Sequence, residues 1–412
     1  MTTQTKNISA PLEGIRVLDL GRYQAGPRCA LMFARMGAEV IKIEGIDGDE
    51  SRKNGPTVRG QSAYWVQYNS GKKSLAINLR DENGKKVLGD LVKMSDVLIQ
   101  NFRPGTIDKM GFGYQELKKL NKKIIMVNVS AYGQYGPYKD RVGFDPIGQA
   151  ISGMMLVNGE EDAPPARTSF PLIDRITSLH ATIGALAALR EREFSGEGQT
   201  IDVCLADTGY TCNEIPITAY LEGGLLPERE GNGKGTGGCY ETKDGYVIIA
   251  ATNENMWERL CDSIQKPEWL EDKKFQTRSD RSKNTSELEA GLQSWFIEHT
   301  MSTAVGILSN NGVPCSPVNS TPQAAEDPHL KAREILVEVT DPIAGSMHVS
   351  GKMIKFGRTE MVVGPTPMIG EHSQQILRDI LGYSDEKISE LSETKTINFS
   401  TKTNNKSHKH GN

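Results

Sequence analysis

Asp174 is the residue whose type and position best suit covalent chemistry in this sequence. It lies in Phe170-Pro-Leu-Ile-Asp-Arg-Ile176, directly before a long apolar pattern that predicts a buried helix. An aspartate at this place is a good helix N-cap, and capping alone would explain it. The helix dipole and the free amides of the first turn would also keep its carboxylate ionised. Since an ionised carboxylate next to a thioester is a competent nucleophile, Asp174 is a cap, a nucleophile or both.

Other catalytic templates are missing. The sequence contains no G-x-S-x-G elbow, no H-E-x-x-H motif and no evident Cys/His pair. Its six cysteines are scattered, without a C-x-x-C pair or a nearby His cluster, so we expect neither a metal site nor a disulfide framework. Reduced thiols fit a cytoplasmic protein.

Basic residues form a second candidate group, at predicted strand ends and in the loop Asn101-Phe-Arg-Pro-Gly105. They are Lys72, Lys73, Arg80, Arg103 and Lys109. A stretch of this kind is often only a solvated face. If the residues gather at one edge of a parallel sheet, they would instead suit an anionic ligand such as a nucleotide phosphate. Phe102 beside them could stack on a purine or belong to the core.

The turn Gly21-Arg-Tyr-Gln-Ala-Gly-Pro27 follows the first predicted strand, where α/β folds bind phosphate groups. A nicotinamide cofactor could bind there, with Glu44 in the place of a ribose-binding acid. However, the G-x-G-x-x-G fingerprint is absent, and Pro27 at the first helical position removes one amide donor. Dinucleotide binding is therefore a minor alternative.

Strand and helix patterns alternate from residue 11 to about residue 200, which predicts an α/β fold with a parallel sheet and crossover helices. The predicted strands span residues 15–20, 40–43, 74–79, 96–100, 124–129 and 200–204. The predicted helices span 27–36, 81–94 with Asp81 as cap, and 176–189. This first domain is expected to end at residue 205.

A second, smaller α/β domain is predicted over residues 226–320, after a linker helix at 206–225. Its elements are a strand at 245–250 and helices at 253–264, 287–298 and 302–310. The Gly-rich stretch Gly231–Gly238 is either a flexible linker or a mobile loop whose amides close over a reacting centre. The polar residues 394–412 predict a disordered tail.

Composition disfavours several partners. The 412 residues include 48 Lys and Arg and 52 Asp and Glu, so no net field would draw the chain to nucleic acid or an anionic membrane. The N-terminus lacks an apolar targeting segment, and the apolar stretch around 181–189 is too short to span a bilayer. We therefore expect a cytoplasmic enzyme without nucleic-acid or membrane partners.

Several motifs, in order and at matching spacing, resemble the class III CoA-transferases, which include formyl-CoA, carnitine and bile-acid CoA-transferases. The resemblance covers Pro11 to about Leu391. The motifs are Leu12-Glu-Gly-Ile-Arg-Val-Leu-Asp-Leu20, Gln24-Ala-Gly-Pro27, Gly37-Ala-Glu-Val-Ile-Lys-Ile-Glu44, Asn101-Phe-Arg-Pro-Gly105, Gly143-Phe-Asp-Pro-Ile-Gly-Gln-Ala150, Asp174 with Gly184-Ala-Leu-Ala-Ala-Leu189, Asp244-Gly-Tyr-Val247 and Gly370-Glu-His-Ser373.

The resemblance implies a Rossmann-like large domain built from both chain ends, with residues 321–393 returning to complete it. It also implies a homodimer whose two subunits interlock as rings. The implied reaction moves CoA from an acyl-CoA to a carboxylic acid through an aspartyl anhydride and an aspartyl-CoA thioester. Coenzyme A is then a substrate, and no cofactor is permanently bound.

By the same resemblance, Asp174 matches the catalytic aspartate, and other positions match CoA contacts. These are Gln24 and Ala25 near the reacting centre, Asn101 and Phe102 at the adenosine, and Arg80 and Lys109 as basic CoA-binding positions. Gly45 replaces an arginine that contacts CoA, for which Arg28, Lys72, Lys73 or Arg103 would compensate. Val142 and Phe144 replace a lysine and a tyrosine near the substrate of formyl-CoA transferase, so we expect an acid larger or less polar than oxalate.

Two alternatives remain within CoA chemistry. An α-methylacyl-CoA racemase of the same superfamily would use a His and an Asp as paired bases. Its His belongs where this chain has Gly143-Phe-Asp145, and the nearest histidine, His180, is expected to be a core residue of the apolar helix. The chain could also bind CoA without catalysis.

Overall fold

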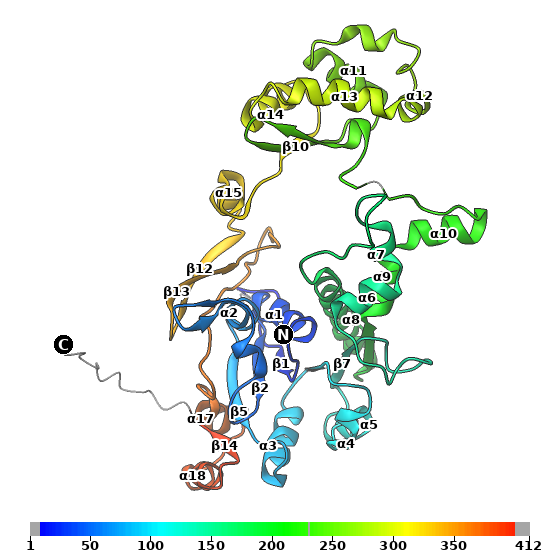
Figure 1. Ribbon diagram of the computed structural model, residues 1–412. Helices are drawn as coiled ribbons and strands as arrows, with labels where there is room; N and C mark the ends of the chain where they lie inside the picture. Colours follow the sequence, from blue (N-terminus) through cyan, green and yellow to red (C-terminus); the bar gives the residue numbers. More distant parts are fainter. Residues whose placement is uncertain (1–8, 230, 400–412) are drawn as a thin grey trace, which may run out of the picture. The chain divides into compact units, whose positions relative to one another are not determined.

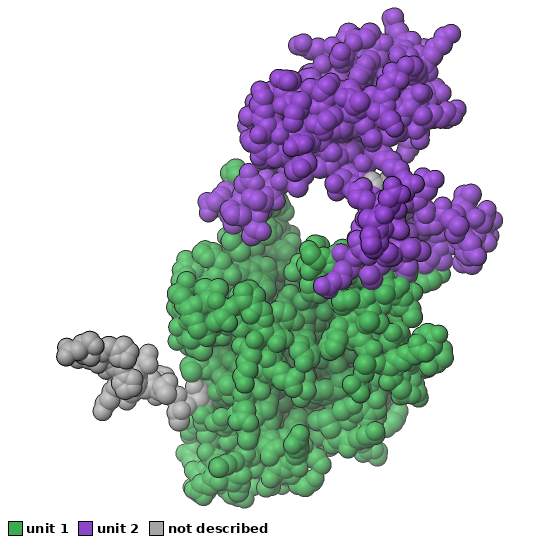
Figure 2. Space-filling model, viewed as in Figure 1, with its two compact units in different colours: residues 1–152, 168–213, 328–412 green, residues 153–167, 214–327 purple. Residues whose placement is uncertain are grey.

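The computed structural model describes residues 9–229 and 231–399, which form two compact units (Figures 1 and 2). Within these ranges, unit 1 takes the residues up to 152, residues 168–213 and those from 328 onward. Unit 2 takes residues 153–167 and 214–327.

A seven-stranded sheet forms the centre of unit 1, in the order β14-β5-β2-β1-β6-β7-β8. Its strands are β1 (Arg16–Asp19), β2 (Glu39–Glu44), β5 (Lys73–Ile77), β6 (Val97–Gln100), β7 (Ile125–Ser130), β8 (Thr200–Cys204) and β14 (Ile397–Asn398). All neighbouring pairs are parallel except β14 with β5. The α/β prediction with a parallel-dominated sheet is thus confirmed.

The other elements of unit 1 are mostly helices. They are α1 (Ala25–Arg35), α2 (Ala63–Asn69), α3 (Glu82–Lys93), α4 (Thr106–Lys109), α5 (Tyr114–Leu120), α6 (Asp145–Ile151), α8 (Leu172–Ser195), α9 (Leu205–Cys212), α16 (Pro328–Ala332), α17 (Ser373–Gln375), a π-helical turn (Ile376–Ile380), α18 (Asp385–Glu393) and a 3₁₀ turn (Glu50–Lys53). Two hairpins join β3 (Thr57–Val58) to β4 (Gln61–Ser62) and β12 (Leu336–Asp341) to β13 (Gly345–Ser350).

Side-chain alternation along the strands builds a core on each face of the sheet. Val17 packs with α1 and α8, whereas its neighbour Leu18 packs with α3, α5 and the C-terminal helical segment. Val40 and Ile41 divide in the same way. Because both faces are covered, the strands are apolar throughout, which is why they are recognisable from sequence.

Helix α8 is, within the described residues, the one helix long and apolar enough to cross a bilayer by length and composition. Such a test is also passed by core helices. Ala181, Ala185 and Ala188 on one face of α8 are buried against the sheet. Packing on the sheet thus accounts for the apolar character of that face.

Unit 2 has its own small sheet and core. Its elements are α7 (Met154–Val157), α10 (Glu214–Gly223), β9 (Cys239–Thr242), β10 (Gly245–Ile249), α11 (Glu254–Ser263), α12 (Arg278–Lys283), α13 (Thr285–Phe296), α14 (Met301–Asn310), β11 (Cys315–Pro317), α15 (Thr321–Glu326) and two 3₁₀ turns (Gly235–Gly237 and Pro267–Leu270). The antiparallel sheet β11-β10-β9 packs with α11, α13 and α14 around Trp257 and Phe296.

The unit bounds differ from the predicted domains in several places. Residues 153–167 belong to unit 2, where their backbone carbonyls bind Arg229 and Gly231. Gly231 N donates to the Gly159 carbonyl at 3.2 Å, and Arg229 Nη1 donates to the Glu160 carbonyl at 3.2 Å. The predicted linker helix is two helices, α9 and α10, divided between the units. The return to unit 1 starts at residue 328 instead of 321.

The predicted tail begins too early. Residues 397–398 form β14, whose backbone pairs with Ala76 and Ile77 of β5, and Ile397 is buried. A two-residue strand shows no periodicity in sequence, and its partner lies far away along the chain. The rest of the predicted tail, 400–412, lies outside the described residues.

Candidate active site

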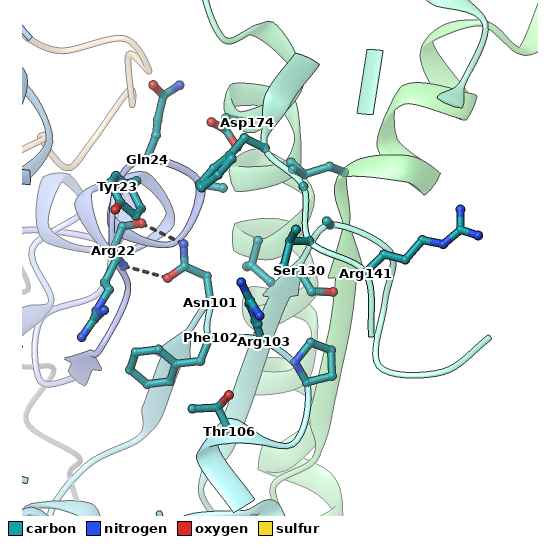
Figure 3. Close-up of a pocket in the computed structure, with 18 of the residues that line it drawn as sticks. Arg22, Tyr23, Gln24, Asn101, Phe102, Arg103, Thr106, Ser130, Arg141 and Asp174 are labelled. Atoms are coloured by element: carbon teal, nitrogen blue, oxygen red, sulfur yellow. Dashed lines mark hydrogen bonds between the residues drawn. The ribbon is translucent and has the colours of Figure 1, made fainter. Parts of the chain in front are cut away.

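A pocket of about 480 Å³ opens in unit 1 at the carboxyl ends of β1, β6 and β7. Loops that follow parallel strands meet at this edge of the sheet, where α/β folds bind ligands. Figure 3 shows Asp174 at one end of the pocket and Phe102 and Thr106 at the other. The lining residues are Arg22, Tyr23, Gln24, Ala25, Glu50, Asn101, Phe102, Arg103, Pro104, Thr106, Val129, Ser130, Ala131, Arg141, Val142, Gly143, Phe144, Asp174 and Leu205.

Asp174 lies inside the first turn of α8, not at its N-cap. The helix begins at Leu172, and Pro171 in the cap position makes no side-chain capping bond. The backbone N–H of Asp174 instead donates to Oδ2 of Asp145, at 2.9 Å. The predicted capping role of Asp174 is therefore wrong, and its carboxylate remains available to the pocket.

The protonation state of Asp174 also differs from the expectation. Burial raises the pKa of its carboxyl to about 7, and the negative charge of Asp145 raises it as well. We expected the helix terminus to keep this carboxylate ionised. Both effects outweigh the helix dipole. Burial removes the water that would stabilise the ionised carboxylate of Asp174, and the negative charge of Asp145 repels it.

A pH dependence follows from this pKa. Only the ionised form of Asp174 can attack, so kcat/KM should fall about tenfold per pH unit below pH 7 and level off above it. The measurement is kcat/KM for the acyl-CoA between about pH 5 and pH 9. A profile that breaks near pH 4, the ordinary pKa of an aspartate, would contradict the effect of burial.

The turn 21–27 carries Gln24 and Ala25 into the pocket. Buried charged side chains hold this turn in place. Lys72 Nζ donates to Asp19 Oδ2 at 2.7 Å and to the Pro27 carbonyl at 2.8 Å, and Lys42 Nζ donates to the Gly21 carbonyl. Asp19, Lys42 and Lys72 are fully buried. Both ends of the turn are thus held by charged groups that never meet solvent.

Glycine is required at the start of this turn. A Cβ on Gly21 would lie 2.9 Å from Asp19 Oδ1 and 2.9 Å from Cδ of Pro27, closer than real Cβ contacts. Two residues later, Tyr23 has a φ of 59°, a left-handed backbone that is uncommon for a tyrosine. Strained backbone of this kind persists where the surrounding structure fixes it, often at functional sites.

The loop 101–104 forms the opposite wall. Asn101 accepts from the Arg22 N–H at 2.7 Å and donates to the Arg22 carbonyl at 2.8 Å, as drawn in Figure 3. Phe102 lines the pocket and also packs against the core. The Arg22 guanidinium lies 5.5 Å from the centre of its ring.

Of the predicted site residues, Asp174, Gln24, Ala25, Asn101, Phe102, Arg103 and Phe144 are brought together in this pocket. Arg80 and Lys109 are exposed beyond it, Arg80 after β5 and Lys109 at the end of α4. They do not line the pocket.

Two predicted phosphate ligands are engaged elsewhere. Lys73 begins β5 and forms an ion pair with Glu39 at 2.6 Å, at the start of β2. The prediction that Lys73 lies at the ligand-binding edge of the sheet was wrong. The first residue of a parallel strand lies at the amino edge of the sheet, and the pocket lies at the carboxyl edge. Lys72 is buried in its ion pair with Asp19 and cannot replace the arginine missing at Gly45.

Several pocket residues were not singled out from sequence. Tyr23 donates its hydroxyl to Glu50 Oε2 at 2.8 Å, and its ring meets Phe144 edge-on at 5.8 Å. Arg22 and Tyr23 belong to the turn 21–27, so that motif was a usable signal. Glu50 begins a short 3₁₀ turn and Arg141 lies in a loop. Neither belongs to a motif, and only the folded chain shows that they reach the pocket.

The alternatives considered from the sequence gain no support from the described part of the chain. No group of His, Cys, Asp and Glu there could hold a metal ion. His180 is exposed, with Nδ1 3.3 Å from the Thr208 hydroxyl, so the expectation of a core histidine was wrong. Glu44, the candidate ribose ligand, is buried and bonded to Arg52 and Ser74.

Comparisons with known proteins show which family this chain belongs to. The family model "CoA-transferase family III" matches residues 12–373. The chain is 33% identical to the succinyl-CoA–D-citramalate CoA-transferase of Chloroflexus aurantiacus, over 94% of this chain and 98% of that protein. It is also 33% identical to the human succinyl-CoA:glutarate CoA-transferase, over 92% of this chain and 88% of that one.

Solved structures show the same fold. A CAIB/BAIF family protein from Brucella suis superposes with a TM-score of 0.82 at 31% identity, covering 90% of this chain and all of that one. The protein Rv3272 of Mycobacterium tuberculosis superposes with a TM-score of 0.80 at 29% identity, covering 89% of this chain and 99% of that one. Because the family model matches most of its length, this chain belongs to CoA-transferase family III.

Proposed function

We propose that this enzyme transfers CoA from an acyl-CoA to a free carboxylic acid, with Asp174 as the nucleophile. The observation that carries the proposal is the carboxylate of Asp174 at one end of an open pocket, in a chain of CoA-transferase family III. Glu50 is the other carboxylate among the lining residues, and it is bonded to Tyr23. Glu50 also forms an ion pair with Arg22 at 3.5 Å, whereas Asp174 forms no ion pair with the described residues.

The proposed reaction runs through three covalent intermediates on Asp174: an anhydride with the first acid, a thioester with CoA and an anhydride with the second acid. The Asp174 carboxylate attacks the thioester carbonyl, and the C–S bond breaks to give an aspartyl anhydride and CoA thiolate. The thiolate attacks the aspartyl carbonyl, which releases the first acid and leaves an aspartyl-CoA thioester. The second acid attacks that thioester and displaces CoA thiolate, which then attacks the new acyl carbonyl. Acyl-CoA leaves, and the carboxylate of Asp174 is restored.

The pocket suggests how CoA lies. Phe102, at the end away from Asp174, presents an aromatic ring for the adenine, and Arg103 beside it is exposed for phosphate. Gln24 and Ala25 line the wall close to Asp174 and would contact the thioester end. Arg80 and Lys109 form no ion pair with the described residues, so they are free to meet phosphates outside the pocket.

For the acceptor, we propose a dicarboxylic acid larger than oxalate. Val142 and Phe144 are apolar lining residues with exposed side chains, which suit a carbon chain better than a two-carbon dianion. Several relatives are named for such acids, including glutarate and citramalate.

We also propose that the enzyme is a cytoplasmic homodimer with interlocked subunits, without a nucleic-acid or membrane partner. Helix α10 supports the dimer, since it is apolar yet has no buried residue in the single chain. Ile215 and Leu221 on α10 are 76% and 67% exposed. On unit 1, Ile183 of α8 is 63% exposed, beside the face that packs on the sheet.

The test is an exchange assay. The protein is incubated with succinyl-CoA and a panel of acids, from oxalate to glutarate, and mass spectrometry follows the new acyl-CoA. Hydroxylamine should convert the covalent intermediate to a hydroxamate on Asp174. Loss of the α-proton to deuterated water without CoA exchange would favour the racemase, and binding of acyl-CoA without either reaction would favour a non-catalytic protein.

Phe102 offers a test of the CoA orientation. Phe102→Leu keeps an apolar side chain against the core but loses the flat ring, so KM for acyl-CoA should rise about tenfold with kcat little changed. Acyl-pantetheine, which lacks the adenosine portion, is the matched control substrate. Its KM should be the same for both proteins, and an equal loss with both substrates would show that Phe102 does not contact the adenosine.

A further inference from the structure

We propose that Asp145 is a positioning residue for the nucleophile: its buried carboxylate caps α8 from another helix and places a fixed negative charge beside Asp174. This inference rests on the proposed role of Asp174. It concerns a residue that does not line the pocket and that would not touch the substrate.

The start of α8 lacks a cap of its own. Helices usually bind their first N–H groups with the side chain that precedes them, but Pro171 has no polar side chain. The carboxylate of Asp145 supplies the missing acceptor, with Oδ2 at 2.9 Å from Asp174 N. Asp145 lies in the first turn of α6 and is 3% exposed. The amide that it binds is that of the proposed nucleophile itself.

A second buried residue fixes Asp145. Gln149, one turn further along α6, donates from Nε2 to Oδ1 of Asp145 and also to the Thr168 hydroxyl at 3.0 Å. Its Oε1 accepts from the Thr168 N–H at 3.0 Å. Both oxygens of Asp145 are thereby engaged, and the segment 168–174 is bonded to α6 at two points.

The same arrangement connects the nucleophile to the pocket wall. Gly143 and Phe144, directly before Asp145, line the pocket. On the other side, Gln24 Nε2 donates to the Pro171 carbonyl at 3.2 Å. The start of α8 is therefore held between Asp145 at the start of α6 and Gln24 at the start of α1.

The charge of Asp145 acts on Asp174 without compensation. Burial and the Asp145 carboxylate both raise the pKa of Asp174. From α2, the Tyr64 phenol also interacts electrostatically with Asp174, and burial raises the pKa of that phenol, so it stays neutral. The nearby cations Arg175 of α8 and Arg28 of α1 interact with each other, and neither forms an ion pair with Asp174 among the described residues.

Two substitutions separate the cap from the charge. Asp145→Asn removes the charge but keeps an oxygen that can accept from Asp174 N. Its new NH₂ group then faces Gln149 Nε2 and loses that hydrogen bond, because the Gln149 amide is held in its orientation by the Thr168 N–H. Asp145→Ala removes both. Asp81→Asn is the matched control, because Asp81 caps α3 by accepting from Asn83 N and lies outside the pocket.

The first measurement is the titration of Asp174 by NMR of ¹³Cγ-labelled aspartate in the whole protein, with its signal assigned from Asp174→Asn. Both Asp145 variants should lower the pKa of Asp174 by roughly one unit, and Asp81→Asn should leave it unchanged. An unchanged pKa in Asp145→Asn would overturn the electrostatic part of the proposal. This titration needs no turnover, so it stands apart from the assay of the proposed function.

The second measurement is amide hydrogen exchange in the first turn of α8, together with kcat at a pH where Asp174 is ionised in every variant. Asp145→Asn should keep the protection and stay within about threefold of the parent kcat, whereas Asp145→Ala should lose the protection and about 10–100-fold of kcat. Equal protection in Asn and Ala variants would overturn the capping part. An enzyme that shows the expected titration and exchange but no CoA transfer would refute the proposed function alone.

Discussion

Replacing Asp174 by alanine is expected to abolish CoA transfer, with a loss of roughly 10⁴-fold or more in kcat, while acyl-CoA still binds. The reaction as proposed has no route that avoids the aspartyl anhydride, so removal of the carboxylate removes the nucleophile rather than weakening it. The measurement is formation of the new acyl-CoA by mass spectrometry, with acyl-CoA binding followed by calorimetry. Asp174→Asn, which keeps the shape of the side chain, should be equally inactive.

Glu50→Gln is the matched control, because Glu50 is the other carboxylate that lines the pocket. This variant should still form the covalent intermediate, and it should lose only the contributions of the Tyr23 hydrogen bond and of the ion pair with Arg22. If Glu50→Gln abolished the hydroxylamine-trapped adduct while Asp174→Ala retained it, the nucleophile would have been assigned to the wrong residue.

Lys72→Met is expected to destabilise the protein by about 3–5 kcal/mol, because it leaves the buried Asp19 carboxylate without one of its cations. Lys42 also interacts with Asp19, but its ammonium is paired with Asp49 at 2.8 Å and bonded to Gly21. Burial lowers the pKa of Lys42, but the negative charges of Asp19 and Asp49 outweigh this effect, so the pKa of Lys42 is raised. The measurement is the free energy of unfolding from urea titration.

The neighbouring Lys73→Met is the control. Lys73 makes an ion pair of similar length with Glu39, but both side chains are about one-third exposed, so its loss should cost less than about 1 kcal/mol. Similar losses for the two variants would show that burial of the Lys72 pair does not govern its contribution to stability.

We also expect Lys72→Met to weaken acyl-CoA binding, since Lys72 donates a hydrogen bond to the Pro27 carbonyl at the end of the turn 21–27.

Much of unit 1 is predictable because its information is local. The strands β1, β2, β5, β6, β7 and β8 were each predicted, since buried parallel strands are short apolar runs of β-branched residues. Asp81 caps α3 as expected, because capping depends on neighbours two or three residues away.

The errors concern short or irregular elements and the surroundings of single residues. Strand β14 has two residues, and the hairpin β12–β13 and the π-helical turn Ile376–Ile380 were not predicted. The exposure of His180 could not be predicted from its apolar neighbours in the sequence. Only one face of α8 packs on the sheet, and His180 lies on a face that does not.

The sequence by itself determined the α/β fold, the family and the identity of the aspartate proposed to act. Side-chain alternation, cap residues and ordered motifs are properties of short segments, and they survive without knowledge of the fold. Only the tertiary structure decided the surroundings of Asp174 and therefore its pKa. The acid beside it lies 29 residues earlier in the chain, and the pocket removes water from its carboxyl, so its pKa rises instead of falling. Electrostatic energies depend on distance and burial in three dimensions, and a position along the chain specifies neither.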